Sequence, residues 1–178
     1  MKLSKSVRLL IAISFISLNP IHSQEIGYCL GINKLGINPS SFQPVYGMSI
    51  GGKLNSFLAL ETNLLYSQRS IGNSIQADYL SFVCMPKIGL FKEKFGVYYA
   101  PALVLNPTLY HSNVENHTYV STMQGIGLEF NLSQKIKIDG KVGYDIGLSG
   151  AYFENGAYQN YSGAFVLLGM KLIICKSN

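Results

Sequence analysis

Hydrophobic and polar residues alternate along most of the chain, and the alternation is clearest from Ile136 to Leu148. Successive side chains of a β-strand point to opposite faces, so a strand divides this segment into one apolar and one polar face, whereas a helix would mix the two sets. The apolar face holds Ile136, Ile138, Val142, Tyr144, Ile146 and Leu148, with Gly140 as the one gap. The polar face holds Lys137, Asp139, Lys141 and Asp145. Globular strands usually have about 5 or 6 residues, so the length of this one is typical of a strand that crosses a membrane.

The same alternation predicts eight strands after residue 25, where helical periodicity is hard to find. They are Glu25–Lys34, Val45–Leu54, Phe57–Arg69, Ala77–Leu90, Phe95–Leu105, Tyr119–Leu132, Ile136–Leu148 and Tyr161–Ile174. The connections between them alternate strictly between long and short, which places the long loops at one end and the tight turns at the other. Outer-membrane barrels have short periplasmic turns and longer external loops. The pattern therefore predicts an all-β fold: a single eight-stranded antiparallel up-and-down transmembrane barrel over residues 25–176. Pro86 cannot donate a hydrogen bond to a sheet ladder, so we expect a bulge or an irregular segment there.

The N-terminus resembles an export signal. Basic residues (Lys2, Lys5 and Arg8) precede an apolar run from Leu9 to Leu18, which is too short to span a bilayer as a helix. We expect residues 1–23 to be a cleaved signal peptide; the alternative is an uncleaved anchor or a buried N-terminal helix. Without this segment, eleven basic residues stand against nine acidic ones, so the charge gives no reason to expect nucleic-acid binding.

Alternation alone does not tell a membrane barrel from a soluble one, because a lipocalin-like barrel points its apolar face inward. Here the polar face is rich in glycine and in charges of both signs, which suits a narrow barrel interior better than a solvated surface. Tyrosines near the predicted strand ends fit the aromatic girdles of a membrane barrel. These are Tyr66, Tyr110, Tyr119 and Tyr161.

The candidate site is a set of charged residues that the barrel would point into its lumen. The set is Lys53, Glu61, Arg69, Glu129, Lys137, Asp139, Lys141 and Asp145. These residues could form a polar relay or a gated path. The alternative is a network of ion pairs that fills the barrel, whose interior at eight strands is only wide enough for side chains.

Other chemistry is weakly supported. Cys29, Cys84 and Cys175 form neither a zinc pattern nor a redox motif, and isolated thiols are favoured over one disulfide. His111 and His117 flank Glu115 in a predicted loop, but no further metal ligand is predicted. The sequence carries no nucleophile-elbow motif. We expect no enzyme activity, no metal and no cofactor.

Three segments resemble a known family. They are Leu60–Arg69 (LETNLLYSQR), Asp78–Leu80 and Tyr98–Leu103 (YYAPAL). Together they are similar to the small outer-membrane β-barrel domain of Bacteroidetes, the PorT-like group. The chain departs from that pattern at Val83, where the family usually has a proline, at Ala100, where a glycine is usual, and in its ending LIICKSN, which lacks a terminal aromatic residue. The resemblance implies an outer-membrane location and a barrel, and some members of the group are linked to secretion.

Three functions remain open. The first is a non-enzymatic outer-membrane barrel that serves as a structural or docking component of the cell envelope, with lipid and other envelope or secretion proteins as partners. The second is a narrow conduit for a small solute. The third is a secreted soluble barrel that binds an apolar ligand.

Overall fold

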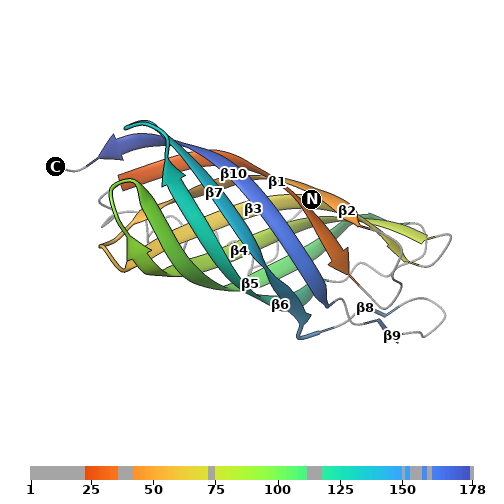
Figure 1. Ribbon diagram of the computed structural model, residues 1–178. Helices are drawn as coiled ribbons and strands as arrows, with labels where there is room; N and C mark the ends of the chain where they lie inside the picture. Colours follow the sequence, from red (N-terminus) through yellow and green to blue (C-terminus); the bar gives the residue numbers. More distant parts are fainter. Residues whose placement is uncertain are drawn as a thin grey trace.

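The predicted eight-stranded antiparallel barrel is confirmed. The computed structural model describes residues 23–35, 42–71, 75–111, 118–149, 151–152, 158–159 and 162–176. Its long strands are β1 (Ser23–Leu35), β2 (Gln43–Lys53), β3 (Leu58–Ile71), β4 (Ile75–Phe91), β5 (Phe95–His111), β6 (Thr118–Asn131), β7 (Ile136–Gly147) and β10 (Gly163–Lys176). They close in the order β1-β10-β7-β6-β5-β4-β3-β2, each antiparallel to its neighbours (Figure 1). Residues 1–22 lie outside the described residues, so the signal peptide stays a prediction.

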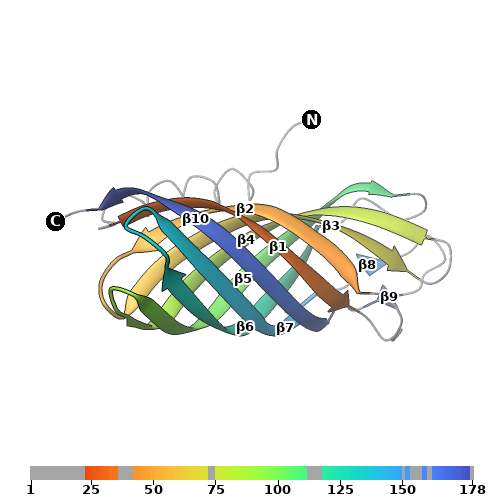
Figure 2. The same ribbon diagram turned by 45° about the horizontal axis from the view of Figure 1, so that its top comes forward.

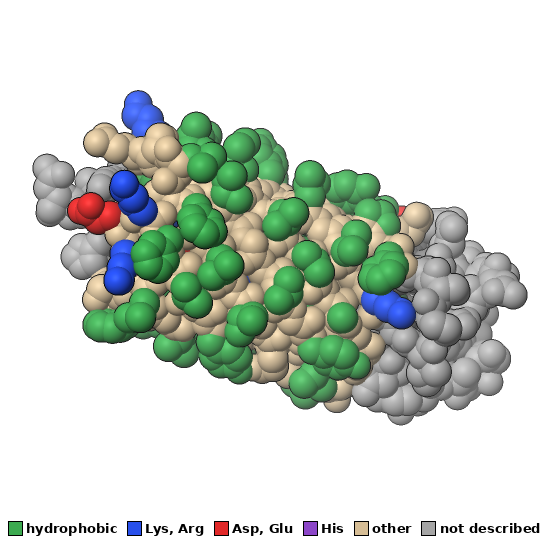
Figure 3. Space-filling view, in the orientation of Figure 1, with side chains coloured by type: hydrophobic (Ala, Val, Ile, Leu, Met, Phe, Trp, Pro, Cys, Tyr) green, Lys and Arg blue, Asp and Glu red, His purple; other side chains and the backbone are tan. Residues whose placement is uncertain are grey.

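The two faces of β7 point as the sequence predicts, with the apolar face outward and the charged face into the lumen. Ile138, Val142 and Tyr144 are exposed on the outside, whereas Lys137 and Asp139 are buried in the interior. The same division runs around the barrel, and hydrophobic side chains cover the flank shown in Figure 3, while the charged side chains in that view lie at the two ends. In the described part of the chain there is no helix long and apolar enough to cross a membrane.

Three tight turns lie at one end of the barrel, where β10 also ends (Figures 1 and 2). They comprise residues 54–57, 92–94 and 132–135. Two are closed by a side chain that accepts backbone hydrogen bonds: Asn55 Oδ1 from the N–H groups of Phe57 and Leu58, and Ser133 Oγ from those of Lys135 and Ile136. Such local bonds are the reason that Asn and Ser favour turns.

The opposite end differs from the prediction. Strands β3, β4 and β5 run further than expected, so that only residues 72–74 connect β3 to β4 and the sheet continues past Leu105 to His111. In Figure 2 the β3–β4 hairpin reaches beyond the mouth of the barrel. Two short strands that the sequence did not predict, β8 (Ala151–Tyr152) and β9 (Tyr158–Gln159), pair with each other at this end.

One local prediction, the irregular segment at Pro86, is confirmed in part, and another is corrected. The β4–β5 ladder is interrupted at Pro86, but the register is the same on both sides, since Cys84 pairs with Leu103 and Ile88 with Tyr99. This register sets Pro86 opposite Pro101. The register of the ladder shifts elsewhere, where Asp78 pairs with Tyr110 and Tyr79 with Thr108, so that the extra residue is on β5. Tyr119 does not belong to an outer girdle, because its side chain is buried in the interior. Tyr66 is exposed as expected, while the side chains of Tyr110 and Tyr161 lie outside the described ones.

The outward face can be tested at Val142, which is 47% exposed in the middle of β7. We expect Val142→Arg to lower the free energy of unfolding in phospholipid vesicles by about 2–4 kcal/mol, because it places a charge near the bilayer midplane. Leu132→Arg, in a tight turn at the barrel end, is the matched control and should cost about 0–1 kcal/mol. Urea titrations followed by circular dichroism measure both; equal costs would mean that Val142 does not face lipid.

Candidate functional site

A cluster of ion pairs crosses the lumen. Glu61 on β3 and Asp139 on β7 come from opposite sides of the wall, and the same three lysines, Lys87, Lys141 and Lys171, contact both. Lys87 Nζ lies 2.6 Å from Glu61 Oε2 and 2.8 Å from Asp139 Oδ2. Lys171 Nζ lies 2.8 Å from the same Asp139 oxygen, and Lys141 Nζ lies 3.3 Å from it. All five side chains are buried. We call these five residues the central cluster.

A second group of charges lies nearer the tight turns. Lys137 pairs with Glu25 and, at 3.2 Å, with Glu129; Lys53 Nζ also lies 3.2 Å from Glu129 Oε1. Glu25, Lys53 and Lys137 line a cavity of about 660 Å³, which the tight turns surround. We call this cavity the vestibule, and we call Glu25, Lys53, Glu129 and Lys137 the vestibule group.

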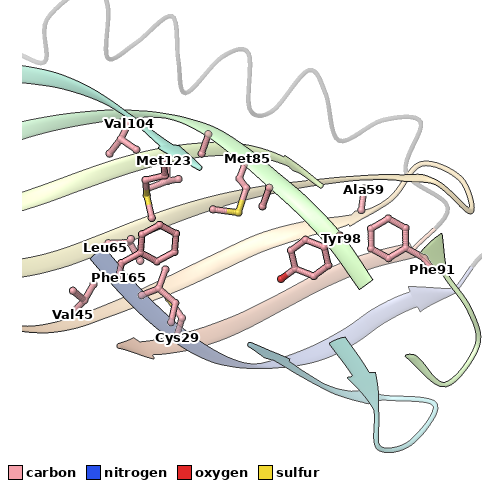
Figure 4. Close-up of a cluster of buried hydrophobic side chains, with 14 residues drawn as sticks. Cys29, Val45, Ala59, Leu65, Met85, Phe91, Tyr98, Val104, Met123 and Phe165 are labelled. Carbon is pink, nitrogen blue, oxygen red and sulfur yellow. The ribbon is translucent and has the colours of Figure 1, made fainter. Parts of the chain in front are cut away.

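Tyr98 on β5 contacts both the central cluster and Phe91, which lines the vestibule. Its hydroxyl donates a hydrogen bond to Asp139 Oδ1, and Lys87 Nζ lies 4.4 Å from the centre of its ring. The ring also stacks on Phe91, with 6.0 Å between the ring centres. Figure 4 shows Tyr98 and Phe91 side by side inside the barrel. Gly127 makes this position possible, because a Cβ atom there would overlap the Tyr98 ring.

Apolar side chains fill the lumen on the far side of the central cluster. Leu65, Met123 and Phe165 gather there (Figure 4). They line a cavity of only about 30 Å³, to which Asn33, Ser67 and Asp145 contribute polar side chains. That volume suffices for about one or two water molecules. Tyr79 and Tyr119, both buried, meet edge to face in the same half of the barrel, with 5.5 Å between ring centres.

The structure brings most of the predicted lumen residues together. It places Glu61, Asp139 and Lys141 in the central cluster and Lys53, Glu129 and Lys137 in the vestibule group. Asp145 is buried at a different level, where it lines the cavity of about 30 Å³. The side chain of Arg69, like those of His111, Glu115 and His117, lies outside the described side chains.

Sequence reasoning missed four members of this site: Glu25, Lys87, Lys171 and Tyr98. The alternation places Glu25 on the same face of its strand as Gly27, and Lys171 on the same face as Gly163 and Gly169. Both could therefore have been assigned to the polar, inward face. Lys87 follows Pro86, which hid the regularity of its strand. Tyr98 is a large residue on a polar face, and only the glycine opposite explains how it fits.

Chemically, every carboxylate of the central cluster and the vestibule group contacts an ammonium group. A buried charge requires a partner because the protein interior screens it poorly, and here each central carboxylate contacts three ammonium groups. Among the described residues, no group of three or more His, Cys, Asp or Glu side chains is arranged to hold a metal ion. Cys29 and Cys84 are free thiols, one buried in the interior and the other partly exposed.

Comparisons with known proteins point to one architecture. No protein-family model matches the chain, and no curated protein matches it in sequence. Solved structures do match. Neisserial surface protein A has a TM-score of 0.67 at 12% identity, covering 84% of this chain and 96% of that one. The outer membrane protein OprG of Pseudomonas aeruginosa has a TM-score of 0.60 at 8% identity, over 87% and 97% of the two chains. Ail, the attachment invasion locus protein of Yersinia pestis, has a TM-score of 0.55 at 16% identity, over 85% and 97%.

The TM-scores show that the fold is shared, and the surface of this chain indicates its surroundings. The closed wall is apolar outside and carries its charges inside, which is the arrangement that a bilayer requires of a barrel. The chain is an eight-stranded outer-membrane β-barrel. The secreted soluble barrel is therefore wrong, because it would expose this apolar outer wall to water.

The central cluster has three lysines for two carboxylates, which predicts an asymmetry between substitutions. Glu61→Gln leaves three buried ammonium groups facing Asp139 alone, and we expect it to lower the free energy of unfolding by about 3–5 kcal/mol. Lys171→Met keeps two lysines against two carboxylates and should cost less.

Urea unfolding in phospholipid vesicles measures both variants, and the double variant Glu61→Gln/Lys171→Met should cost less than the sum of the two. Equal costs for the two single variants would show that charge balance within the cluster does not control its stability.

Proposed function

We propose that this outer-membrane barrel is a non-enzymatic structural or docking component of the cell envelope, which acts through its surfaces and not through its lumen. The observation that carries the proposal is the central cluster, whose ion pairs cross the lumen from β3 to β7. Side chains that fill an eight-stranded barrel leave no room for a solute.

Two further features support a closed lumen. The vestibule ends at the ion pairs of Glu25, Lys137 and Glu129. Beyond the central cluster lies the apolar layer around Phe165, which is a separate barrier to ions. A conduit would need both layers to open. We propose that the lumen charges hold the barrel together and do not form a relay or a path.

The loop end offers a surface for docking. Crossing a bilayer takes about 9–11 tilted strand residues, whereas β4 and β5 have 17 each. The additional residues of β4 and β5 lie at the end opposite the tight turns, where the β3–β4 hairpin projects. Ail, which shares the fold, was solved in complex with the heparin analogue sucrose octasulfate, so a barrel of this architecture can hold a ligand. The resemblance to the PorT-like group supports partners among envelope or secretion proteins.

A conductance measurement tests the closed lumen. The full chain, folded into a planar lipid bilayer, should show no stepwise currents, because the central cluster and the apolar layer both block the lumen. Circular dichroism of the same preparation in vesicles verifies that it is folded. Stepwise currents from folded protein would favour the conduit and overturn the closed lumen.

Shortening the β3–β4 hairpin tests the docking surface. Arg69 and Ala77 are paired directly, so an Asn-Gly turn can replace residues 70–76 and close the hairpin there. We expect this variant to keep the free energy of unfolding of the parent protein but to lose cross-links to neighbouring envelope proteins in intact cells.

The matched control replaces only residues 72–74 with Gly-Ser-Gly and keeps the hairpin length; its cross-links should persist. If the shortened variant retains the cross-links of the parent, this hairpin is not the docking surface.

A further inference from the structure

Gly140 is a glycine that the barrel itself does not need. It lies on the outward face of β7, between Ile138 and Val142, and is paired with Leu128 on one side and Leu168 on the other. A Cβ atom at Gly140 would meet only Leu168 Cδ2, at 3.4 Å, which is an ordinary contact. By contrast, a Cβ atom at the inward-facing Gly27 or Gly127 would overlap a neighbouring side chain.

The missing side chain leaves a groove of about 360 Å³ in the outer wall. Its floor is the backbone around Gly127, Gly140 and Lys141. Its sides are aliphatic and come from four strands: Val97, Ile126, Leu128, Val142, Val166 and Leu168. The groove is part of the apolar surface that faces lipid, so hydrocarbon is what surrounds it.

Gly140, in the floor of the groove, lies within the depth of one leaflet. Gly140 lies five residues along the chain from Lys135, in the turn before β7. At about 3.3 Å per residue and a tilt of about 40°, this corresponds to about 13 Å along the membrane normal. Half of the hydrocarbon core is about 15 Å thick. A lipid whose headgroup lies at the level of the tight turns therefore reaches Gly140 with its acyl chain, and tight turns face the periplasm in outer-membrane barrels.

The same end carries the positive charge that a phosphate group needs. Lys92 and Lys135 are exposed in the turns before β5 and β7, two of the strands that form the groove. Lys92 Nζ lies 5.5 Å from the ring centre of Phe95, which is itself exposed on the outer face. Basic side chains beside an apolar surface attract anionic lipid headgroups.

We propose that the groove at Gly140 is a binding site for one acyl chain of a periplasmic-leaflet phospholipid, whose phosphate lies beside Lys92 and Lys135. The continuity of the groove with the lipid-facing surface, its aliphatic lining and the basic turns below it all specify this occupant. The site rests on the membrane location of the barrel and is independent of the proposed docking role.

Photolabelling tests the site. The full chain is folded into vesicles of phosphatidylethanolamine and phosphatidylglycerol that contain a phosphatidylglycerol with a diazirine in its acyl chain, and labelled peptides are mapped by mass spectrometry. We expect more label around Ile126, Val142 and Leu168 than around Met48 and Ile50, which form a matched outward surface on β2. Gly140→Leu, which fills the groove, should abolish this excess, and Gly140→Ala should reduce it. The double variant Lys92→Glu/Lys135→Glu should reduce it as well.

Circular dichroism verifies that each variant folds. If Gly140→Leu does not fold, the labelling of Gly140→Ala decides the result. Even labelling of the two surfaces, or an excess that survives filling of the groove, would mean ordinary lipid contact and overturn the proposal. An excess unaffected by the lysine variants would overturn the phosphate assignment. Displacement of the label by added lipopolysaccharide would assign the groove to an outer-leaflet lipid instead, and cross-links between two copies of the chain would make it a dimer contact; either outcome overturns the proposal.

Discussion

The pairing of buried carboxylates with buried lysines is the interaction on which the rest of this barrel depends. Glu61 and Asp139 come from opposite sides of the wall and are joined through the same three lysines. Shifting a strand by one residue would turn its charged side chains toward lipid and its apolar side chains toward the lumen. The ion pairs inside and the hydrocarbon outside therefore fix the same strand register, and each reinforces the other.

Glycine is what lets so many long side chains meet near the axis. Lys171 lies over Gly27 on the neighbouring strand, and Tyr98 lies over Gly127; a Cβ atom at either glycine would overlap them. The lumen of an eight-stranded barrel has little space to spare, so bare backbone on one strand makes room for a long residue on the next. The glycine-rich polar face and the buried charges are thus two parts of one packing arrangement.

The alternation predicted the strands and the direction of the side chains in β7, because lipid and lumen impose opposite chemistry on the two faces of a spanning strand. It failed at the ends of β3, β4 and β5, where the strands continue past the expected boundaries; a strand that leaves the bilayer has water on both sides and no reason to alternate. The ion-pair partners were not predictable in the same way. Lys171 and Glu61 are 110 residues apart in sequence, and their contact depends on how strands are staggered around the closed sheet.

The one gap in the apolar face of β7 shows why the two kinds of glycine have to be distinguished. An inward glycine is explained as soon as the side chain lying over it is known, as for Gly127 beneath Tyr98. Gly140 has no such side chain above it and would accept a Cβ atom, and glycine weakens a strand interior. We propose that its explanation lies outside the wall, in the acyl chain that contacts the groove. The ion pairs that cross the lumen and the groove in the outer wall are the two observations behind our proposal that this barrel acts through its surfaces.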